Sequence, residues 1–112
     1  MCIRDRGNVH LQTDAGGRLD EDRIQAIESV TEVPLVIHGG SGVPNDQRLS
    51  LAANTAICKY NIGTELRQVF GQALRTAVNE DPDQFDRVAI LKQTHDPIMQ
   101  ATRKVLRSVT PT

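Results

Sequence analysis

Two short strand patterns in this chain each end in residues that could bind an anion or a metal. The first, residues 33–37, ends at His38, and Gly39, Gly40 and Ser41 follow directly. Glycines at the carboxyl end of a strand let backbone N–H groups approach an anion closely, because no Cβ stands in the way. A neutral imidazole at the same edge is a common metal ligand. This stretch therefore predicts a phosphate cradle beside a metal ligand.

A second junction of the same kind follows further along the chain. Residues 57–61 form another short strand pattern, which ends at Asn61. A helical pattern then runs over residues 64–79, and Thr64 is placed to cap its first free N–H groups. Two consecutive βα junctions rich in anion-binding groups are typical of the phosphate site after strands 7 and 8 of a (β/α)₈ barrel.

These junctions belong to an alternation of strands and helices, which predicts an α/β fold. We predict a strand end at residues 7–10, strands at 33–37 and 57–61, helices at 19–30, 46–54 and 64–79, and a helical segment at 88–108 that breaks near Pro97. In the third helix we expect five apolar residues to face the core: Leu66, Val69, Phe70, Ala73 and Leu74. The chain has 112 residues, whereas a complete (β/α)₈ barrel takes about 250.

The composition excludes several kinds of partner. The net charge is −1 and aromatic residues make up 3%, so neither a basic patch nor a base-stacking platform indicates nucleic acid. No apolar run reaches the roughly 18 residues that indicate a membrane span, and no signal-peptide pattern is present. Cys2 and Cys58 form neither a metal motif nor a disulfide framework, and we expect Cys58 to be a buried, reduced thiol. The cytosol is the default compartment.

Residues 1–6 do not fit the rest of the pattern. They include the tract Arg4, Asp5 and Arg6, which is a poor sequence for a buried parallel strand. We therefore interpret residues 1–6 as a non-native leader and residues 7–112 as the part that carries the fold.

With these residues in place, the chain resembles the C-terminal part of class II, zinc-dependent ketose-bisphosphate aldolases, which include fructose-bisphosphate and tagatose-bisphosphate aldolases. The resemblance rests on residues 7–10, 35–44 and 59–66, in this order. It implies the C-terminal portion of a TIM (β/α)₈ barrel, with the end of strand 6, βα units 7 and 8 and a C-terminal helical extension. It also implies a lyase that reversibly cleaves a ketose 1,6-bisphosphate to dihydroxyacetone phosphate and an aldehyde.

The resemblance assigns roles to several residues. It implies that His10 and His38 are zinc ligands, and that a third histidine and the proton-transferring aspartate lie in an upstream segment that this chain lacks. No catalytic acid or base is therefore assigned here, and Asp14 is only the nearest carboxylate. A monovalent cation is a further expected cofactor. The resemblance implies that the substrate phosphate is bound by five residues: Gly39, Gly40, Ser41, Asn61 and Thr64.

Further expectations concern assembly and activity. Family members form homo-oligomers and borrow a basic residue for the distal phosphate from a neighbouring subunit, and Arg87 and Lys92 lie in the matching region. Because part of the site is missing, we expect the isolated chain to be inactive. The alternative is a non-catalytic, phosphate-sugar-binding half-barrel or assembly module. A third interpretation is a phosphate-binding barrel of different chemistry, in which His10 and His38 bind no metal.

Overall fold

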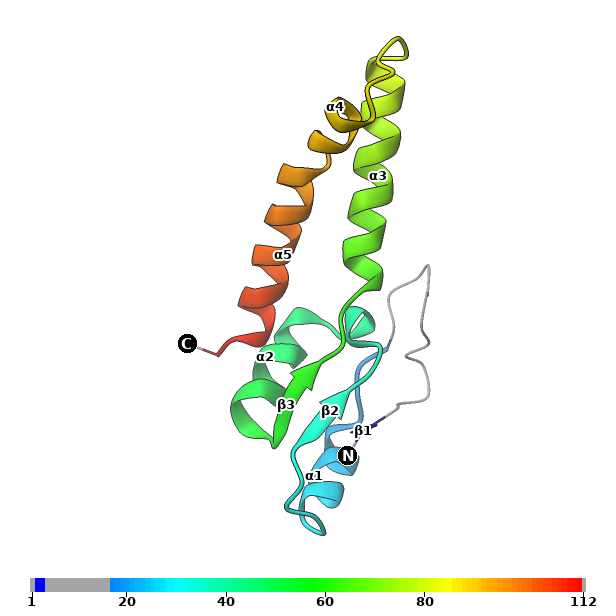
Figure 1. The fold of residues 1–112 in the computed structure, drawn as a ribbon. Coiled ribbons are helices and arrows are strands. Elements are labelled where there is room, and N and C mark those ends of the chain that lie inside the picture. The colour runs from blue at the N-terminus through cyan, green and yellow to red at the C-terminus, as the bar shows by residue number, and fades with distance from the viewer. Residues whose placement is uncertain (1, 4–16, 112) are drawn as a thin grey trace.

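The computed structural model describes residues 2–3 and 17–111. Their three parallel strands form one sheet in the order β1 (Cys2–Ile3), β2 (Leu35–Ile37) and β3 (Ile57–Tyr60) (Figure 1). β2 and β3 lie where the apolar runs predict strands. The predicted strand end at residues 7–10 lies outside the described residues.

β1 differs from the sequence-based expectation, because it comes from the segment that we interpreted as a leader. Cys2 pairs with Val36, and Ile3 pairs with Ile37. Parallel pairing uses backbone groups, so a short extended segment can line up beside β2 even where its neighbours in sequence are charged.

Two helices cover one face of the sheet. α1 (Glu21–Glu28) begins after Asp20, whose carboxylate accepts a hydrogen bond from the Arg23 N–H at 3.0 Å, and acidic residues fill its first turn. α2 (Asn45–Asn54) follows Pro44, whose fixed φ suits the start of a helix. Between these helices and the sheet lies a core of seven buried apolar residues: Leu19, Ile24, Leu35, Ile37, Val43, Leu51 and Ile57.

The core predicts a graded response to a small cavity. Ile37 is completely buried at the carboxyl end of β2. Replacing Ile37 by valine should lower the free energy of unfolding by about 0.5–1.5 kcal/mol, because one methylene is lost from a packed site. Val30→Ala is the control, since Val30 is 82% exposed, and urea denaturation measures both. An Ile37→Val variant as stable as the wild type would show that this core is loosely packed.

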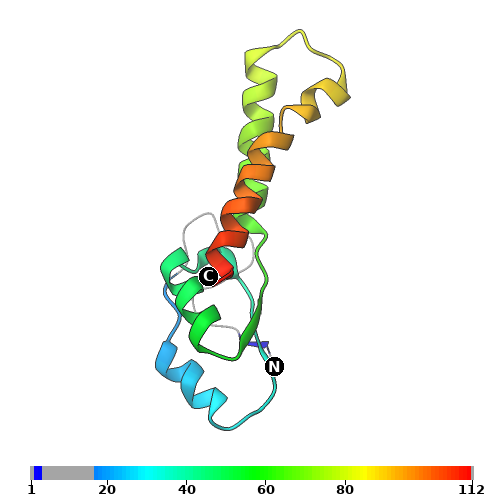
Figure 2. The same cartoon turned by 90° about the vertical axis from the view of Figure 1, so that its left-hand side faces the viewer.

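The three C-terminal helices form a hairpin that projects from the sheet. α3 (Thr64–Glu80) and α5 (His95–Val109) lie side by side, and α4 (Arg87–Lys92) turns the chain at the far end (Figures 1 and 2). The molecule extends 59 × 28 × 20 Å with a radius of gyration of 17.2 Å, against about 13 Å for a compact domain of similar length. The hairpin accounts for this extended shape.

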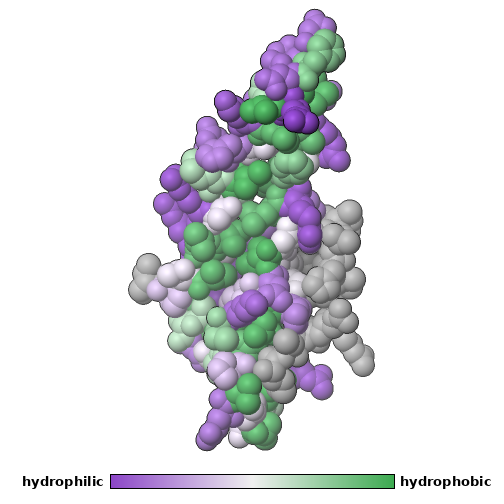
Figure 3. Space-filling model, in the orientation of Figure 1, coloured by the Kyte–Doolittle hydropathy of each residue, from purple (hydrophilic) through white to green (hydrophobic). Residues whose placement is uncertain are grey.

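The predicted core face of α3 packs elsewhere. None of its five apolar residues belongs to the core cluster, and Phe70 is 37% exposed. The periodicity correctly indicated a helix, but α3 packs along α5 rather than on the sheet. Hydrophobic residues are visible along the hairpin in Figure 3.

Two further expectations are corrected. The break in the C-terminal helical segment falls at Gln93 and Thr94, and Pro97 lies in the first turn of α5, where proline is tolerated. Cys58 is exposed, and its thiol lies 3.5 Å from the Leu35 carbonyl oxygen. It falls where the register between β2 and β3 shifts, so that Leu35 pairs with Ile57 and Val36 with Lys59. No described helix is long and apolar enough to span a membrane.

Candidate active site

The loops after β2 and β3 meet at the carboxyl edge of the sheet. The loop after β2 holds His38, Gly39 and the short 3₁₀ helix Gly40–Gly42. The Gly40 N–H donates a hydrogen bond to the Asn61 carbonyl oxygen at 3.0 Å, and the Asn61 N–H donates to the Ile37 carbonyl oxygen at 2.8 Å. The structure therefore brings together the two groups of site residues that the sequence predicts, apart from His10, which lies outside the described residues.

Two glycines shape the first loop for different reasons. Gly39 has a φ of 68°, in the left-handed region that favours glycine. Gly40 is buried, and a Cβ on it would lie 3.0 Å from Ile62 Cγ1 and 3.3 Å from the Asn61 carbonyl oxygen. Because the Gly40 N–H already binds Asn61, the contribution of Gly40 within this structure is to allow the close approach of the two loops.

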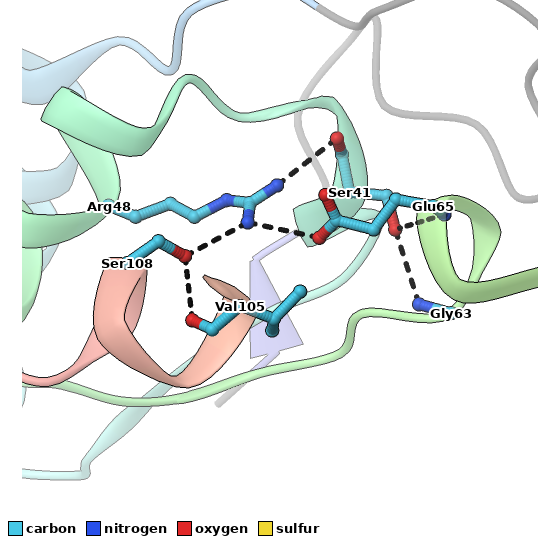
Figure 4. Close-up of polar contacts among 6 residues, drawn as sticks. All are labelled: Ser41, Arg48, Gly63, Glu65, Val105 and Ser108. Atoms are coloured by element: carbon cyan, nitrogen blue, oxygen red, sulfur yellow. Dashed lines mark hydrogen bonds and ion pairs between the residues drawn. The ribbon is translucent and has the colours of Figure 1, made fainter. Parts of the chain in front are cut away.

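Ser41 joins the first loop to the start of α3. Its hydroxyl oxygen accepts hydrogen bonds from the N–H groups of Gly63 at 3.2 Å and Glu65 at 3.4 Å (Figure 4). Gly63 occupies the N-cap position and Thr64 is the first helical residue, so the predicted capping role of Thr64 is wrong. The serine hydroxyl from the neighbouring loop binds the helix N–H groups instead. With both lone pairs used, its own proton has no acceptor among the residues that the structure describes and can be donated to a ligand.

His38 and Asn61 interact through their side chains. The Asn61 amide nitrogen lies 2.9 Å from His38 Nδ1, and both residues are partly buried. Metal-binding histidines donate the N–H of their second ring nitrogen to an acceptor, so metal binding through Nε2 would require the Asn61 amide to turn its oxygen, rather than its nitrogen, toward Nδ1. Among the described residues, no three His, Cys, Asp or Glu side chains are grouped to hold a metal ion. A metal site at His38 would therefore need further ligands from outside the described residues, such as His10.

Arg48 was missed by the sequence analysis. It lies on α2 and is only 2% exposed, although hydrophobicity alone does not mark its position as buried. The available signal was helical spacing: if Leu51 is taken as a core residue, Arg48 and Gln47 lie three and four positions before it and share its face.

Arg87 and Lys92 are exposed on α4, at the far end of the hairpin (Figure 1).

Tyr60 connects β3 to α2 behind the site. Its hydroxyl donates a hydrogen bond to the Arg48 carbonyl oxygen at 3.2 Å. Burial raises the pKa of Tyr60 to about 12, against a smaller opposing effect of the Arg48 charge. The tyrosine is therefore neutral and a hydrogen-bond donor at physiological pH.

The raised pKa of Tyr60 predicts a loss of stability in alkali. The folded-state pKa of about 12 exceeds the ordinary tyrosine pKa of 10.0, so the folded state holds this proton more tightly than the unfolded state. The free energy of unfolding should be insensitive to this group below pH 10 and fall as the pH rises toward 12. Denaturation at several pH values measures the fall, and Tyr60→Phe should reduce it. An equal fall in that variant would assign it to other groups.

The parallel strands and the paired glycine- and serine-bearing loops define an α/β protein whose candidate site lies at the carboxyl edge of the sheet. The sequence model of the family described as Fructose-bisphosphate aldolase class-II matches residues 6–111. This chain therefore belongs to the class II fructose-bisphosphate aldolase family.

Two relatives show how much of such a protein the chain represents. Over 101 residues it is 33% identical to the 6-phospho-5-dehydro-2-deoxy-D-gluconate aldolase of Halalkalibacterium halodurans, covering 90% of this chain and 35% of that protein. The crystal structure of the YdjI aldolase from Escherichia coli K12 is similar, with a TM-score of 0.63 and 25% identity, covering 82% of this chain and 34% of that one. The chain thus spans about a third of the length of these relatives.

Proposed function

We propose that this chain is the C-terminal portion of a class II aldolase TIM barrel, comprising the end of strand 6, βα units 7 and 8 and a helical extension. The whole enzyme would reversibly cleave a ketose 1,6-bisphosphate to dihydroxyacetone phosphate and an aldehyde. Family membership and the strand-end loops support this proposal. The observation that carries it is Ser41, whose hydroxyl accepts two hydrogen bonds at the N-terminus of α3 and donates to no acceptor within residues 17–111.

The loops would bind the phosphate group of the substrate. Ser41 would donate its hydroxyl proton to a phosphate oxygen, and the left-handed Gly39 would let the backbone approach. The first turn of α3, which contains Thr64, adds the partial positive charge of a helix N-terminus. A phosphate fixed in this way holds the attached three-carbon unit in one orientation for reaction.

The imidazole at the sheet edge fits a zinc site. His38 is partly buried and its Nδ1 lies 2.9 Å from the Asn61 amide nitrogen. With the amide turned so that its oxygen accepts from the Nδ1 N–H, Nε2 would be left to bind a metal. His38 and His10, with a ligand from outside this chain, would hold Zn²⁺. When bound, the ion would act as a Lewis acid on the ketone oxygen of the substrate. Asn61 would keep the His38 ring in its binding orientation.

A second substrate is favoured by the curated relative. The name 6-phospho-5-dehydro-2-deoxy-D-gluconate describes a ketone next to a phosphorylated carbon, and the ketose 1,6-bisphosphates have the same feature. The two phosphate-binding loops would therefore accept the same end of either molecule. The residues that meet the other end decide between them.

The test uses the longest polypeptide that the gene encodes around this segment. Cleavage of fructose 1,6-bisphosphate and of 6-phospho-5-dehydro-2-deoxy-D-gluconate is measured for the wild type, Ser41→Ala and the control Ser50→Ala on the exposed side of α2. Loss of one hydrogen bond to phosphate should raise KM about five-fold or more in Ser41→Ala alone. Cleavage of neither substrate, with phosphate-ester binding that survives chelation, would favour the non-catalytic module.

Zinc binding is tested separately from activity. His38→Ala should lower the zinc content of the purified protein, measured by mass spectrometry of the metal, while His95→Ala on the exposed start of α5 should not. Equal zinc in the two variants would contradict the assignment. The 112-residue chain alone should not turn over substrate, and a chelator-sensitive, enzyme-like rate from it would also contradict the proposal.

A further inference from the structure

A buried guanidinium group lies directly behind the Ser41 loop. Arg48 Nη1 donates hydrogen bonds to Glu65 Oε1 at 3.0 Å and to Ser108 Oγ at 3.1 Å, and its Nη2 donates to the Ser41 carbonyl oxygen at 3.2 Å (Figure 4). These partners come from the loop after β2, the first turn of α3 and the last turn of α5. One side chain therefore connects three elements.

Packing alone does not account for this charge. The Arg48 side chain is 2% exposed, and removing a guanidinium group from water costs several kcal/mol before its partners are counted. Its Nε is buried without a hydrogen-bond partner among the described residues. Because an apolar side chain often fills such a site at equal or better stability, the arrangement favours a role in geometry.

Arg48 holds Ser41 from two directions. It binds the Ser41 carbonyl oxygen directly, which fixes the peptide that follows. It also binds the Glu65 carboxylate, and the backbone N–H of Glu65 donates to the Ser41 hydroxyl oxygen. The position of the serine hydroxyl relative to α3 therefore depends on the guanidinium group.

The same group makes the loop depend on α5. Ser108 accepts a hydrogen bond from Arg48 and donates one to the Val105 carbonyl oxygen at 2.7 Å, and the serine is buried. Displacement of the last turn of α5 would remove one of the contacts that orient the guanidinium. A helix far from Ser41 in the sequence is thus connected to it through one side chain.

We propose that Arg48 is a positioning residue that sets the phosphate-binding geometry of Ser41 and couples it to the docking of α5. This inference rests on the proposed function, in which Ser41 binds the substrate phosphate. The guanidinium fork reaches acceptors in three directions, which a single ammonium group cannot reproduce.

The experiment measures phosphate binding and kinetics in the longest polypeptide encoded around this segment. Inorganic phosphate is titrated by calorimetry into the wild type, Arg48→Lys and the control Arg18→Lys, whose ion pair with Asp46 is exposed on both sides. Arg48→Lys should bind phosphate roughly five- to twenty-five-fold more weakly, as expected for one or two lost hydrogen bonds. It should raise KM for the sugar phosphate more than it changes kcat, and Arg18→Lys should do neither.

A milder variant decides the matter if Arg48→Lys does not fold, as judged by circular dichroism. Ser108→Ala removes one hydroxyl from α5 and should weaken phosphate binding roughly two- to five-fold at unchanged helix content. Unchanged affinity in Ser108→Ala would overturn the coupling to α5. Normal affinity in a folded Arg48→Lys would overturn the positioning role while leaving the proposed function intact. A wild-type protein that does not bind phosphate would instead refute the proposed function, and the positioning role with it.

Discussion

Replacing Glu65 by alanine should lower the free energy of unfolding by about 3 kcal/mol or more, because it leaves the Arg48 guanidinium buried without its counter-charge. The two side chains differ in exposure, at 2% for Arg48 and 33% for Glu65. Water can reach the carboxylate side of the pair but not the rest of the guanidinium, which places the expected loss near the lower end of the range for broken buried pairs. Urea denaturation of the wild type and the variant measures the difference.

A second substitution shows whether the unpaired charge is the cause. Adding Arg48→Met to Glu65→Ala removes that charge and fills the space with an unbranched side chain of similar length, so most of the stability should return. Phosphate affinity should not return, because the contacts that orient Ser41 are gone. Asp46→Ala breaks the exposed pair with Arg18 and should have no measurable effect on stability. Equal losses in Glu65→Ala and the double variant would contradict this explanation.

Replacing Gly40 by alanine should lower the free energy of unfolding by about 1–3 kcal/mol and weaken substrate binding at the same time. The new Cβ would lie 3.0 Å from Ile62 Cγ1 and 3.3 Å from the Asn61 carbonyl oxygen. Asn61 O is a backbone atom, so the loop after β3 has to shift as a unit. That shift would displace Asn61 from His38 and Gly63 from Ser41.

Gly17 is the matched control for Gly40. A Cβ on Gly17 would meet no atom of the described part of the chain within 4 Å, so Gly17→Ala tests alanine in place of glycine without crowding from these residues. Denaturation and the KM for the sugar phosphate are measured in both variants. A Gly40→Ala protein with wild-type stability and KM would show that the loops tolerate a wider separation than the structure implies.

The elements that could be predicted from the sequence are those with local causes. β2 and β3 follow from short runs of apolar and β-branched residues, and α3 follows from a regular helical period. The contact between His38 and Asn61 was also predictable, because the carboxyl ends of parallel strands lie at the same edge of a sheet. The zinc and phosphate roles of these residues stay predictions.

The misses have non-local causes. The cap of α3 is a serine from another loop rather than Thr64, and no pattern around Thr64 contains that information. The apolar residues of α3 were assigned to the core because periodicity indicates that one face of a helix is buried, not which element covers it. Arg48 was overlooked because a charged residue within a helix is usually solvated, and its partners Glu65 and Ser108 lie far along the sequence.

The long helical hairpin is joined to the sheet at one end, beside the candidate site, so a force on its free end would tilt it about that base. Glu65 near the start of α3 and Ser108 near the end of α5 both lie at its base, while residues 81–86 lie at its tip (Figure 1). A rigid tilt displaces each point in proportion to its distance from the pivot. A contact at the tip, where Phe85 is 86% exposed, can therefore move the tip widely while Ser41 barely shifts. Only torque large enough to part Arg48 from Ser108 would reach the loop that holds the serine.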